Sequence, residues 1–258
     1  MSDGVASGFA RMGARVKVAT TERFAVRIDV LRDRGGEYFS VRHRADTDVD
    51  VLEVAPWDRH LLLRVSAAGA NGPGTFLCGR DECHWFVAAI PEAADARTVQ
   101  QAKDALKPPE VWDSIRSHRL PPERRDGRRT EAFVRQGEWF FLPRPELEVP
   151  AEGVLEYEPI RRGAGKAHFC RHLYRVGGSR VYVCDAYPNG LTRRQFRKLS
   201  SGERRRHEWV AMVRDAAVYV RGTVEHPDHK PIWLGCWHQV VMNTETQAEA
   251  MRHVAFLD

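Results

Sequence analysis

The stretch "GKAHFCRHLYRVGGSRVYVCDAYP", residues 165–188, has the pattern of two β-strands around a tight turn. Apolar runs lie on both sides of Gly177 and Gly178, and paired glycines supply the positive φ angles that a hairpin turn needs. The stretch therefore predicts an antiparallel β-hairpin.

One face of this predicted hairpin carries metal-ligand side chains. Because side chains alternate across a strand, His168, Cys170 and His172 share a face, and neighbours on that face lie about 6 to 7 Å apart. Imidazole and thiolate groups at that spacing can converge on one ion. A two-residue turn places Asp185 opposite Cys170, whereas a three-residue turn places Cys184 opposite His172, and the sequence leaves both open.

A second group of histidines flanks the turn "EHPDHK", residues 225–230. Pro227 suits the second position of a type I turn and Asp228 the third, so His226 and His229 become its ends, about 7 Å apart at most. Such a pair can chelate an ion. His238 lies on the strand that follows.

These two regions together predict a metal centre, and zinc suits a mixed set of imidazole and thiolate ligands. The predicted ligands are His168, Cys170, His226 and His229, with His172, Cys184 and His238 as further candidates. Four ligands would close the site as a structural centre, and three would leave a position for water. In the alternative interpretation, the histidines bond to backbone carbonyls and Cys170 is an ordinary buried thiol.

The rest of the chain predicts an α+β fold that is dominated by strands, in mostly antiparallel sheets or a barrel with short helical inserts. Capping-box spacings at Thr98 to Gln101, Thr192 to Gln195 and Ser200 to Glu203 mark helix starts. The expected organisation is an N-terminal α+β domain over 1–118, a basic linker over 119–130, and a β-rich domain over 131–258 with a helical insert at 192–214.

The charge of the chain suggests an anionic partner such as nucleic acid. Its 258 residues have a formal net charge of +5, and the densest basic runs lie at 114–129 and 192–207. Solvated loops and helix faces are the alternative explanation. The residues expected to contact phosphate are Arg161, Arg162, Lys166, Arg193 and Arg194.

Several classes of protein are disfavoured by the sequence. It has no GxxxxGK[ST], GxGxxG, GxSxG or HExxH motif, so the common ATPase, dinucleotide-binding, esterase and zincin interpretations fall away. Five cysteines, an odd number, argue against a disulfide framework. No signal peptide and no apolar run of membrane-spanning length is visible, which predicts a cytoplasmic protein without a membrane partner.

Three segments, "RQGEWFFLP" at 135–143, "GKAHFC" at 165–170 and "HPDHKPIWL" at 226–234, resemble a loose set of uncharacterised bacterial and phage β-rich proteins. Those proteins have a QGD-type strand, a GHAH-like segment and an HPEH-like turn. Lys166 stands where their first histidine would be. The resemblance implies that His168, His226 and His229 form one cluster, and it carries no established activity.

Two functional hypotheses follow. In the first, the chain is a nucleic-acid-associated β-rich binding protein whose His/Cys cluster holds a structural zinc. In the second, it is a metal-dependent hydrolase, such as a nuclease, in which three ligands hold the ion and Asp228 or Glu225 accepts a proton from water. A fourth ligand from Cys184 or His238 would favour the first.

Overall fold

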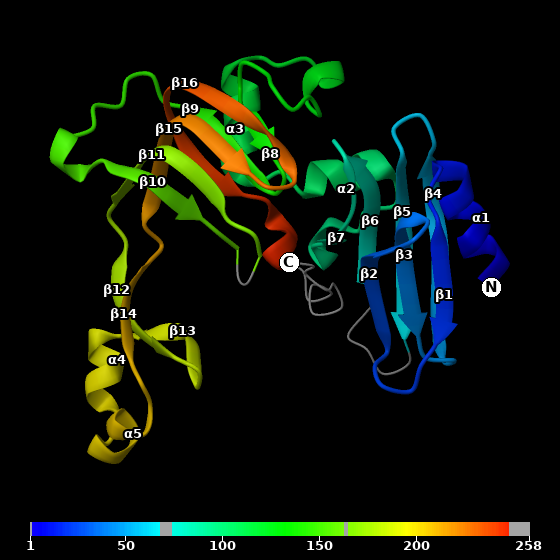
Figure 1. The fold of residues 1–258 in the computed structure, drawn as a ribbon, viewed down its shortest axis with the longest axis horizontal. Coiled ribbons are helices and arrows are strands. Elements are labelled where there is room, and N and C mark those ends of the chain that lie inside the picture. The colour runs from blue at the N-terminus through cyan, green and yellow to red at the C-terminus, as the bar shows by residue number, and fades with distance from the viewer. Residues whose placement is uncertain (1, 68–73, 163–164, 248–258) are drawn as a thin grey trace.

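The computed structural model describes residues 2–67, 74–162 and 165–247, and it confirms a strand-dominated α+β fold. The strands form four open sheets rather than a barrel (Figure 1). Among the described strands, one neighbouring pair is parallel and the others are antiparallel. Within the same residues, no helix is long and apolar enough to cross a membrane.

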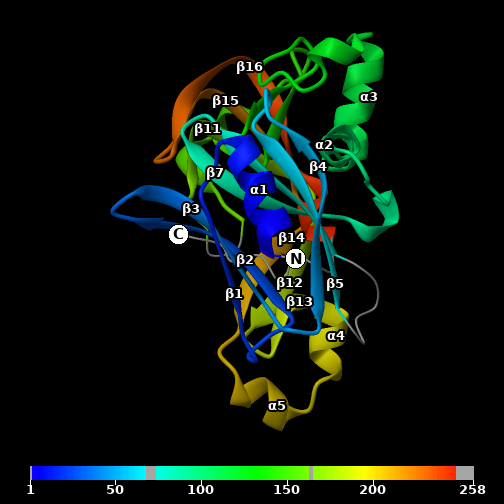
Figure 2. The same cartoon turned by 90° about the vertical axis from the view of Figure 1, so that its right-hand side faces the viewer.

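The N-terminal part contains one helix and two sheets that share a core. A three-stranded sheet has the order β1-β3-β2, and a four-stranded meander has the order β4-β5-β6-β7. The elements are α1 (Ser2–Met12), β1 (Val16–Thr20), β2 (Val26–Asp33), β3 (Gly36–His43), β4 (Thr47–Ala55), β5 (His60–Ala67), β6 (Gly74–Asp81) and β7 (His84–Ile90). Phe9 of α1 packs on Phe39 at 4.7 Å between ring centroids, and the helix lies across these strands in Figure 2.

Two short helices, α2 (Val99–Ala105) and α3 (Pro109–Ser117), connect this part to the rest of the chain. The predicted capping box at Thr98 is present, and Pro109 occupies the first turn of α3. Helix α2 packs on the meander, whereas Val111 and Ile115 of α3 pack with Phe133 in a separate core. Between α2 and α3, upstream of the predicted linker, the chain thus passes from the core of the N-terminal part to a separate core. The predicted domain boundaries themselves stay a prediction, and residues 248–258 lie outside the described residues.

A six-stranded antiparallel sheet forms the second half, in the order β10-β11-β15-β16-β9-β8. Its elements are β8 (Val134–Gln136), β9 (Trp139–Pro143), β10 (Leu155–Ile160), β11 (His168–Val176), β15 (Ala217–His226) and β16 (His229–Met242). In the described residues, short 3-10 helices lie at Glu92–Ala94, Pro122–Arg124, Ala151–Gly153 and Thr244–Gln247. One face of the sheet buries a core that includes Cys170, Leu173 and Val224.

Residues 179–214, which we call the arm, project from this sheet (Figures 1 and 2). The arm contains β12 (Ser179–Cys184), β13 (Tyr187–Thr192), α4 (Arg193–Lys198), α5 (Ser201–Arg206) and β14 (Val210–Arg214). Aromatic rings hold it together: Tyr182 stacks on Phe196 with ring centroids 4.4 Å apart, and Trp209 meets Phe196 edge-on at 4.9 Å.

The predicted hairpin at Gly177 and Gly178 is wrong. Both glycines have positive φ, yet β11 pairs with β15 and β12 pairs with β14, so the chain continues from the sheet into the arm. Strands β11 and β15 pair at seven positions, from Phe169 with Glu225 to Val176 with Ala217, and this long-range pairing outcompetes the local turn. The question of a two- or three-residue turn therefore does not arise.

The helical insert is shorter than predicted. Both capping boxes, at Thr192 and Ser200, are present, but α5 ends at Arg206 and residues 210–214 form strand β14. The last part of the predicted insert is thus an exposed strand that pairs with β12.

Candidate metal centre

Three histidines meet where three neighbouring strands of the six-stranded sheet begin or end. His168 begins β11, His226 ends β15 and His229 begins β16. The turn at Pro227 and Asp228 joins the last two, which pair across it as predicted. Ring centroids lie 4.1 Å apart for His168 and His226, and 4.7 Å apart for His226 and His229. One nitrogen from each ring lies within 4.8 Å of the other two, so this histidine cluster could hold a metal ion.

His168 is the most informative member of the cluster. Its side chain is 1% exposed, and neither ring nitrogen has a hydrogen-bond partner among the described residues. Buried polar groups are almost always bonded, and an unsatisfied one costs about 1–3 kcal/mol. A buried imidazole with two unpaired nitrogens therefore points to a ligand that the side chains themselves do not supply.

His229 is oriented so that one nitrogen faces the cluster and the other faces a carboxylate. A Cβ built on Gly137 would lie 3.1 Å from Nε2 of His229 and 3.7 Å from Nε2 of His168. The opposite nitrogen, Nδ1 of His229, lies 3.9 Å from Glu82 Oε2. A proton on Nδ1 leaves the Nε2 lone pair available, which is the arrangement that carboxylates support around metal-bound histidines. Gly137 keeps the space in front of both Nε2 atoms clear.

His226 is held by its own turn. The Asp228 backbone N–H donates to Nδ1 of His226 at 3.1 Å, and the Asp228 carboxylate pairs with Lys166 Nζ at 2.9 Å. If Nε2 of His226 is to bind an ion, its proton must move to Nδ1, and this backbone bond is lost. Metal binding and the geometry of the Pro227–Asp228 turn are therefore coupled.

Burial keeps the cluster uncharged. It lowers the pKa of His168 to about 3, with His226 and His229 as smaller causes, and lowers the pKa of His226 to about 4, with His229 as the next cause. Burial also lowers the pKa of His229. Metal binding needs neutral imidazole, so at neutral pH the cluster requires no deprotonation before it can bind.

The arrangement is close to that of a metal-bound triad but not identical with it. The three ring planes lie within 31° of one another, as in a stack. Nitrogens around a tetrahedral zinc lie about 3.3 Å apart, given bonds of about 2.0–2.1 Å. The rings must therefore rotate and approach to share an ion, toward the space beside Gly137.

Cys170, the fourth predicted ligand, does not join the cluster. Phe169 pairs with Glu225 and Cys170 with Val224, so continuing the register puts His168 beside His226 and Cys170 about 7 Å further along the strand. Its thiol lies in the apolar core, where burial raises its pKa to about 12. Alternation thus keeps His168 and Cys170 on the buried side of β11, but Cys170 lies too far along the strand to reach the other two histidines.

The further candidates also lie elsewhere. Phe169, Arg171 and His172 line a pocket on the opposite face of the sheet, because alternation is interrupted next to a bulge in β15. Cys184 belongs to the arm. Nδ1 of His238 lies 2.9 Å from the Cys236 carbonyl oxygen, which matches the alternative interpretation for this histidine. Among the described residues, the cluster thus has three potential ligands.

The predicted phosphate-contacting residues are divided between two places. Arg193 and Arg194 are exposed on α4 in the arm, and Arg161 is exposed after β10. Arg162 pairs with the buried Glu245 at 2.6 Å, and Lys166 pairs with Asp228. Arg162 therefore already neutralises a buried carboxylate, whereas the Lys166–Asp228 pair lies at the surface.

Sequence analysis missed Gly137 and Glu82. The sequence "QGE" around Gly137 indicates a turn, but it does not indicate that Gly137 lies beside His168 and His229. Glu82, in the β6–β7 turn, also accepts the Lys230 backbone N–H at 2.9 Å. Almost 150 residues separate these partners, so no local pattern could have revealed the contact.

Comparison with known proteins gives no relatives. No family model matches the chain, and neither the curated proteins nor the solved structures contain a match. The resemblance to uncharacterised bacterial and phage proteins accordingly stays a prediction.

Proposed function

We propose that this protein is a metal-dependent hydrolase that acts on nucleic acid, with zinc held by His168, His226 and His229. The observation that carries the proposal is the buried His168 imidazole in the histidine cluster, whose two nitrogens have no hydrogen-bond partner in the described part of the chain. Imidazole ligands suit zinc, and three ligands plus a free position are typical of catalytic rather than structural zinc.

The surroundings of the cluster support a catalytic role. A cleft of about 760 Å³ lies beside it, lined by His229, Gly137, Glu138, Lys166 and Asp228, among others. The cleft also takes in residues of the N-terminal sheets, so both halves of the chain contribute to it. This volume is in the range of small-molecule and substrate pockets, roughly 300–1,000 Å³.

Asp228 is the better of the two predicted proton acceptors. It lines the cleft, and Lys166 keeps its pKa lowered despite partial burial. Glu225 lies on the opposite face of β15 and accepts the Tyr157 hydroxyl at 3.4 Å, so it faces away from the cluster. A bound divalent ion supplies an acidified water. Asp228 would then orient that water and take up its proton.

The arm supports nucleic acid as the substrate class. Between Ser179 and Arg214 lie nine Arg or Lys residues and three Asp or Glu residues, a net charge of +6, whereas the whole chain has +5. The rest of the chain is therefore close to neutral, at −1. All nine basic side chains are exposed. Such a concentrated positive surface favours phosphate backbones through counterion release.

The first test is metal content, measured by mass spectrometry on protein purified without a tag. We expect about one zinc per wild-type chain and none in the His226→Ala/His229→Ala double variant. Gly137→Ala tests the space before the Nε2 atoms, and Gly177→Ala is its matched control. Both glycines have positive φ, but a Cβ on Gly177 has nothing within 4 Å. Zinc lost from both glycine variants alike, or zinc absent from wild type, would overturn the metal centre.

The second test separates an enzyme from a binding protein. Cleavage of labelled single-stranded and double-stranded oligonucleotides is followed with and without chelator, together with circular dichroism. A hydrolase loses turnover on chelation while it stays folded, and Asp228→Asn loses turnover while it keeps zinc. Binding that depends steeply on salt, without any cleavage, would instead favour the non-enzymatic hypothesis, for which the charge of the arm is the specific observation.

A further inference from the structure

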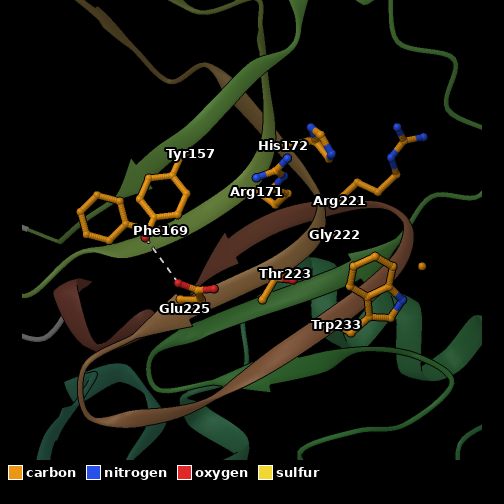
Figure 3. A pocket seen from close by; sticks show the side chains of 10 residues that line it. Tyr157, Phe169, Arg171, His172, Arg221, Gly222, Thr223, Glu225 and Trp233 are labelled. Carbon is orange, nitrogen blue, oxygen red and sulfur yellow. Dashed lines mark hydrogen bonds between the residues drawn. The ribbon is translucent and has the colours of Figure 1, made fainter.

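The six-stranded sheet carries a second pocket, shown in Figure 3. Phe169 and Glu225, which line it, are the neighbours of His168 and His226 along their strands, so the pocket lies on the face opposite the histidine cluster. Its volume is about 550 Å³, and it lies over β10, β11, β15 and β16. The side chains that matter for the argument are Tyr157, Phe169, Arg171, Arg221, Glu225 and Trp233. We call this site the outer pocket.

Aromatic rings with exposed faces line both sides of the outer pocket. Tyr157 and Phe169 stack at 5.3 Å with an interplanar angle of 21°, and Trp233 stands across from them in Figure 3. Tyr157 is 57% exposed and Trp233 is 63% exposed. Large rings normally gain stability from burial, so two exposed rings facing one pocket form a surface suited to a planar, apolar ligand.

The backbone is strained where it presents these groups. Tyr157 has φ +54°, a left-handed conformation that costs a residue with a side chain of order 1–3 kcal/mol. Gly222 has φ +87° at the bulge in β15, and a Cβ there would lie 3.1 Å from Cβ of Arg171. The bulge thus makes room for Arg171 beside the aromatic rings.

Charge divides the outer pocket into two ends. Arg171 and Arg221 are exposed at one end, and the Arg221 guanidinium lies 5.1 Å from the ring centroid of Trp237, which positions it. Glu225 lies at the other end, where it accepts the Tyr157 hydroxyl. Guanidinium groups bind phosphate, aromatic faces stack on bases, and a carboxylate accepts hydrogen bonds from base amino groups.

We propose that the outer pocket binds unpaired bases of a single-stranded nucleic acid, with a base stacked on Trp233 or on the Tyr157–Phe169 pair and its phosphate at Arg171 and Arg221. Duplex nucleic acid does not fit this chemistry, because its bases are stacked on one another and cannot reach aromatic side chains. This inference rests on the proposed association with nucleic acid and adds the strandedness of the ligand.

The topology of the sheet predicts the path that a bound single-stranded nucleic acid follows over the protein. Strands β11 and β15 run as one pair from His168 and His226 at one end to Val176 and Ala217 at the other, where the arm begins. The outer pocket lies between those ends. A single strand bound to the basic arm therefore meets the arginine end first and the aromatic rings next, on the way to the edge that holds the histidine cluster.

The test is fluorescence anisotropy with labelled DNA and RNA oligonucleotides of about 12 nucleotides, single-stranded and duplex, in the presence of EDTA so that no cleavage occurs. Trp233→Ala should weaken single-strand binding roughly 5- to 150-fold, the range for loss of one stacked base, and leave duplex binding unchanged. Arg171→Gln/Arg221→Gln should lower the salt dependence of single-strand binding by about 1.4 in log–log slope, at about 0.7 per phosphate contact.

Trp57→Ala is the matched control, because Trp57 is fully exposed and lies in the N-terminal part, away from the outer pocket. Binding by Trp233→Ala that equals that of Trp57→Ala would overturn the outer pocket and leave the arm intact. Wild-type protein that binds no oligonucleotide would overturn both the outer pocket and the nucleic-acid part of the proposed function. A preference for DNA or for RNA identifies the source of the bases, and either one supports the proposal.

Discussion

Replacing His168 with phenylalanine should change the stability of the protein in opposite directions with and without zinc. The substitution keeps an aromatic ring, which preserves contact with His226 and with Trp139, whose centroids lie 4.1 Å and 6.4 Å from that of His168. It removes two buried nitrogens that have no partner among the described residues. Each unsatisfied group costs about 1–3 kcal/mol, and a slightly larger ring costs roughly 1–3 kcal/mol in repacking. In EDTA we expect His168→Phe to be more stable than wild type by about 1–3 kcal/mol.

Zinc should reverse the order of the two proteins. A ligand that binds only the folded state at a thousand times its Kd stabilises that state by about 4.1 kcal/mol. Wild type gains this free energy, and His168→Phe, which lacks a ligand, gains none of it. The variant should therefore unfold at a lower urea concentration than wild type in zinc and at a higher one in EDTA.

The control is His238→Phe. His238 is also buried, at 7% exposed, but its Nδ1 lies within hydrogen-bond distance of the Cys236 carbonyl oxygen. Its loss should destabilise the protein by about 1–3 kcal/mol in both conditions and leave the response to zinc unchanged. If His168→Phe were destabilised in EDTA as much as His238→Phe, the nitrogens of His168 would be satisfied in solution and the reasoning would be refuted.

Three further predictions concern acid, a buried ion pair and the carboxylate behind His229. Because the folded pKa values of His168, about 3, and His226, about 4, lie below the unfolded value of 6.5, the unfolded state binds more protons between those limits. Metal-free protein should thus lose stability as pH falls from 6.5 toward 4. A urea midpoint of unfolding that does not change over this pH range would show that burial does not lower the pKa values of these histidines. Asp126→Asn removes one of the two carboxylates that pair with Lys107, whose side chain is 4% exposed: the 2.7 Å pair with Asp126 is lost and the 2.9 Å pair with Asp104 remains. The substitution should lower the free energy of unfolding by roughly 1–3 kcal/mol in urea titrations. Glu82→Gln should weaken zinc binding about tenfold in competition with a chelating dye, the lower limit for such supporting groups, and unchanged affinity would remove Glu82 from the centre.

The fold was predictable where local signals decided it. Capping boxes at Thr98, Thr192 and Ser200 all begin helices, because the reciprocal hydrogen bonds depend on residues three apart and on nothing distant. The pairing of β11 was not predictable. Gly177 and Gly178 adopt the positive φ of a hairpin, but strand partners are chosen by burial across the whole sheet.

The candidate site divides in the same way. His226 and His229 could be paired from the sequence because a two-residue turn joins them. His168 joins them only through the register of β11 against β15, which also excludes Cys170. A strand pattern specifies the face of a side chain, whereas its position along the neighbouring strand depends on pairings that the pattern does not contain.

The strand pair β11–β15 connects the three features that the proposals use. The histidine cluster lies at one end, the outer pocket over the middle and the arm beyond the other end. The pair continues into β12 and β14 through a joint with three left-handed residues, Gly177, Gly178 and Asp215, at φ +71°, +82° and +61°. These residues lie between β11 and β12 and between β14 and β15, so the joint sets where the positive charge of the arm stands relative to the pocket.

Gly178 is the critical residue of that joint. A Cβ there would lie 2.8 Å from the Arg214 carbonyl oxygen and 2.8 Å from the Ala216 nitrogen, and backbone atoms cannot move aside as a flexible side chain can. We therefore expect Gly178→Ala to displace the arm and weaken binding of long single strands, which reach both arm and pocket, while binding of short ones and zinc content stay unchanged. Gly177→Ala, with the same positive φ and open space, is the control. If both variants bind long strands as wild type does, the arm is not positioned by this joint, and the outer pocket must act without it.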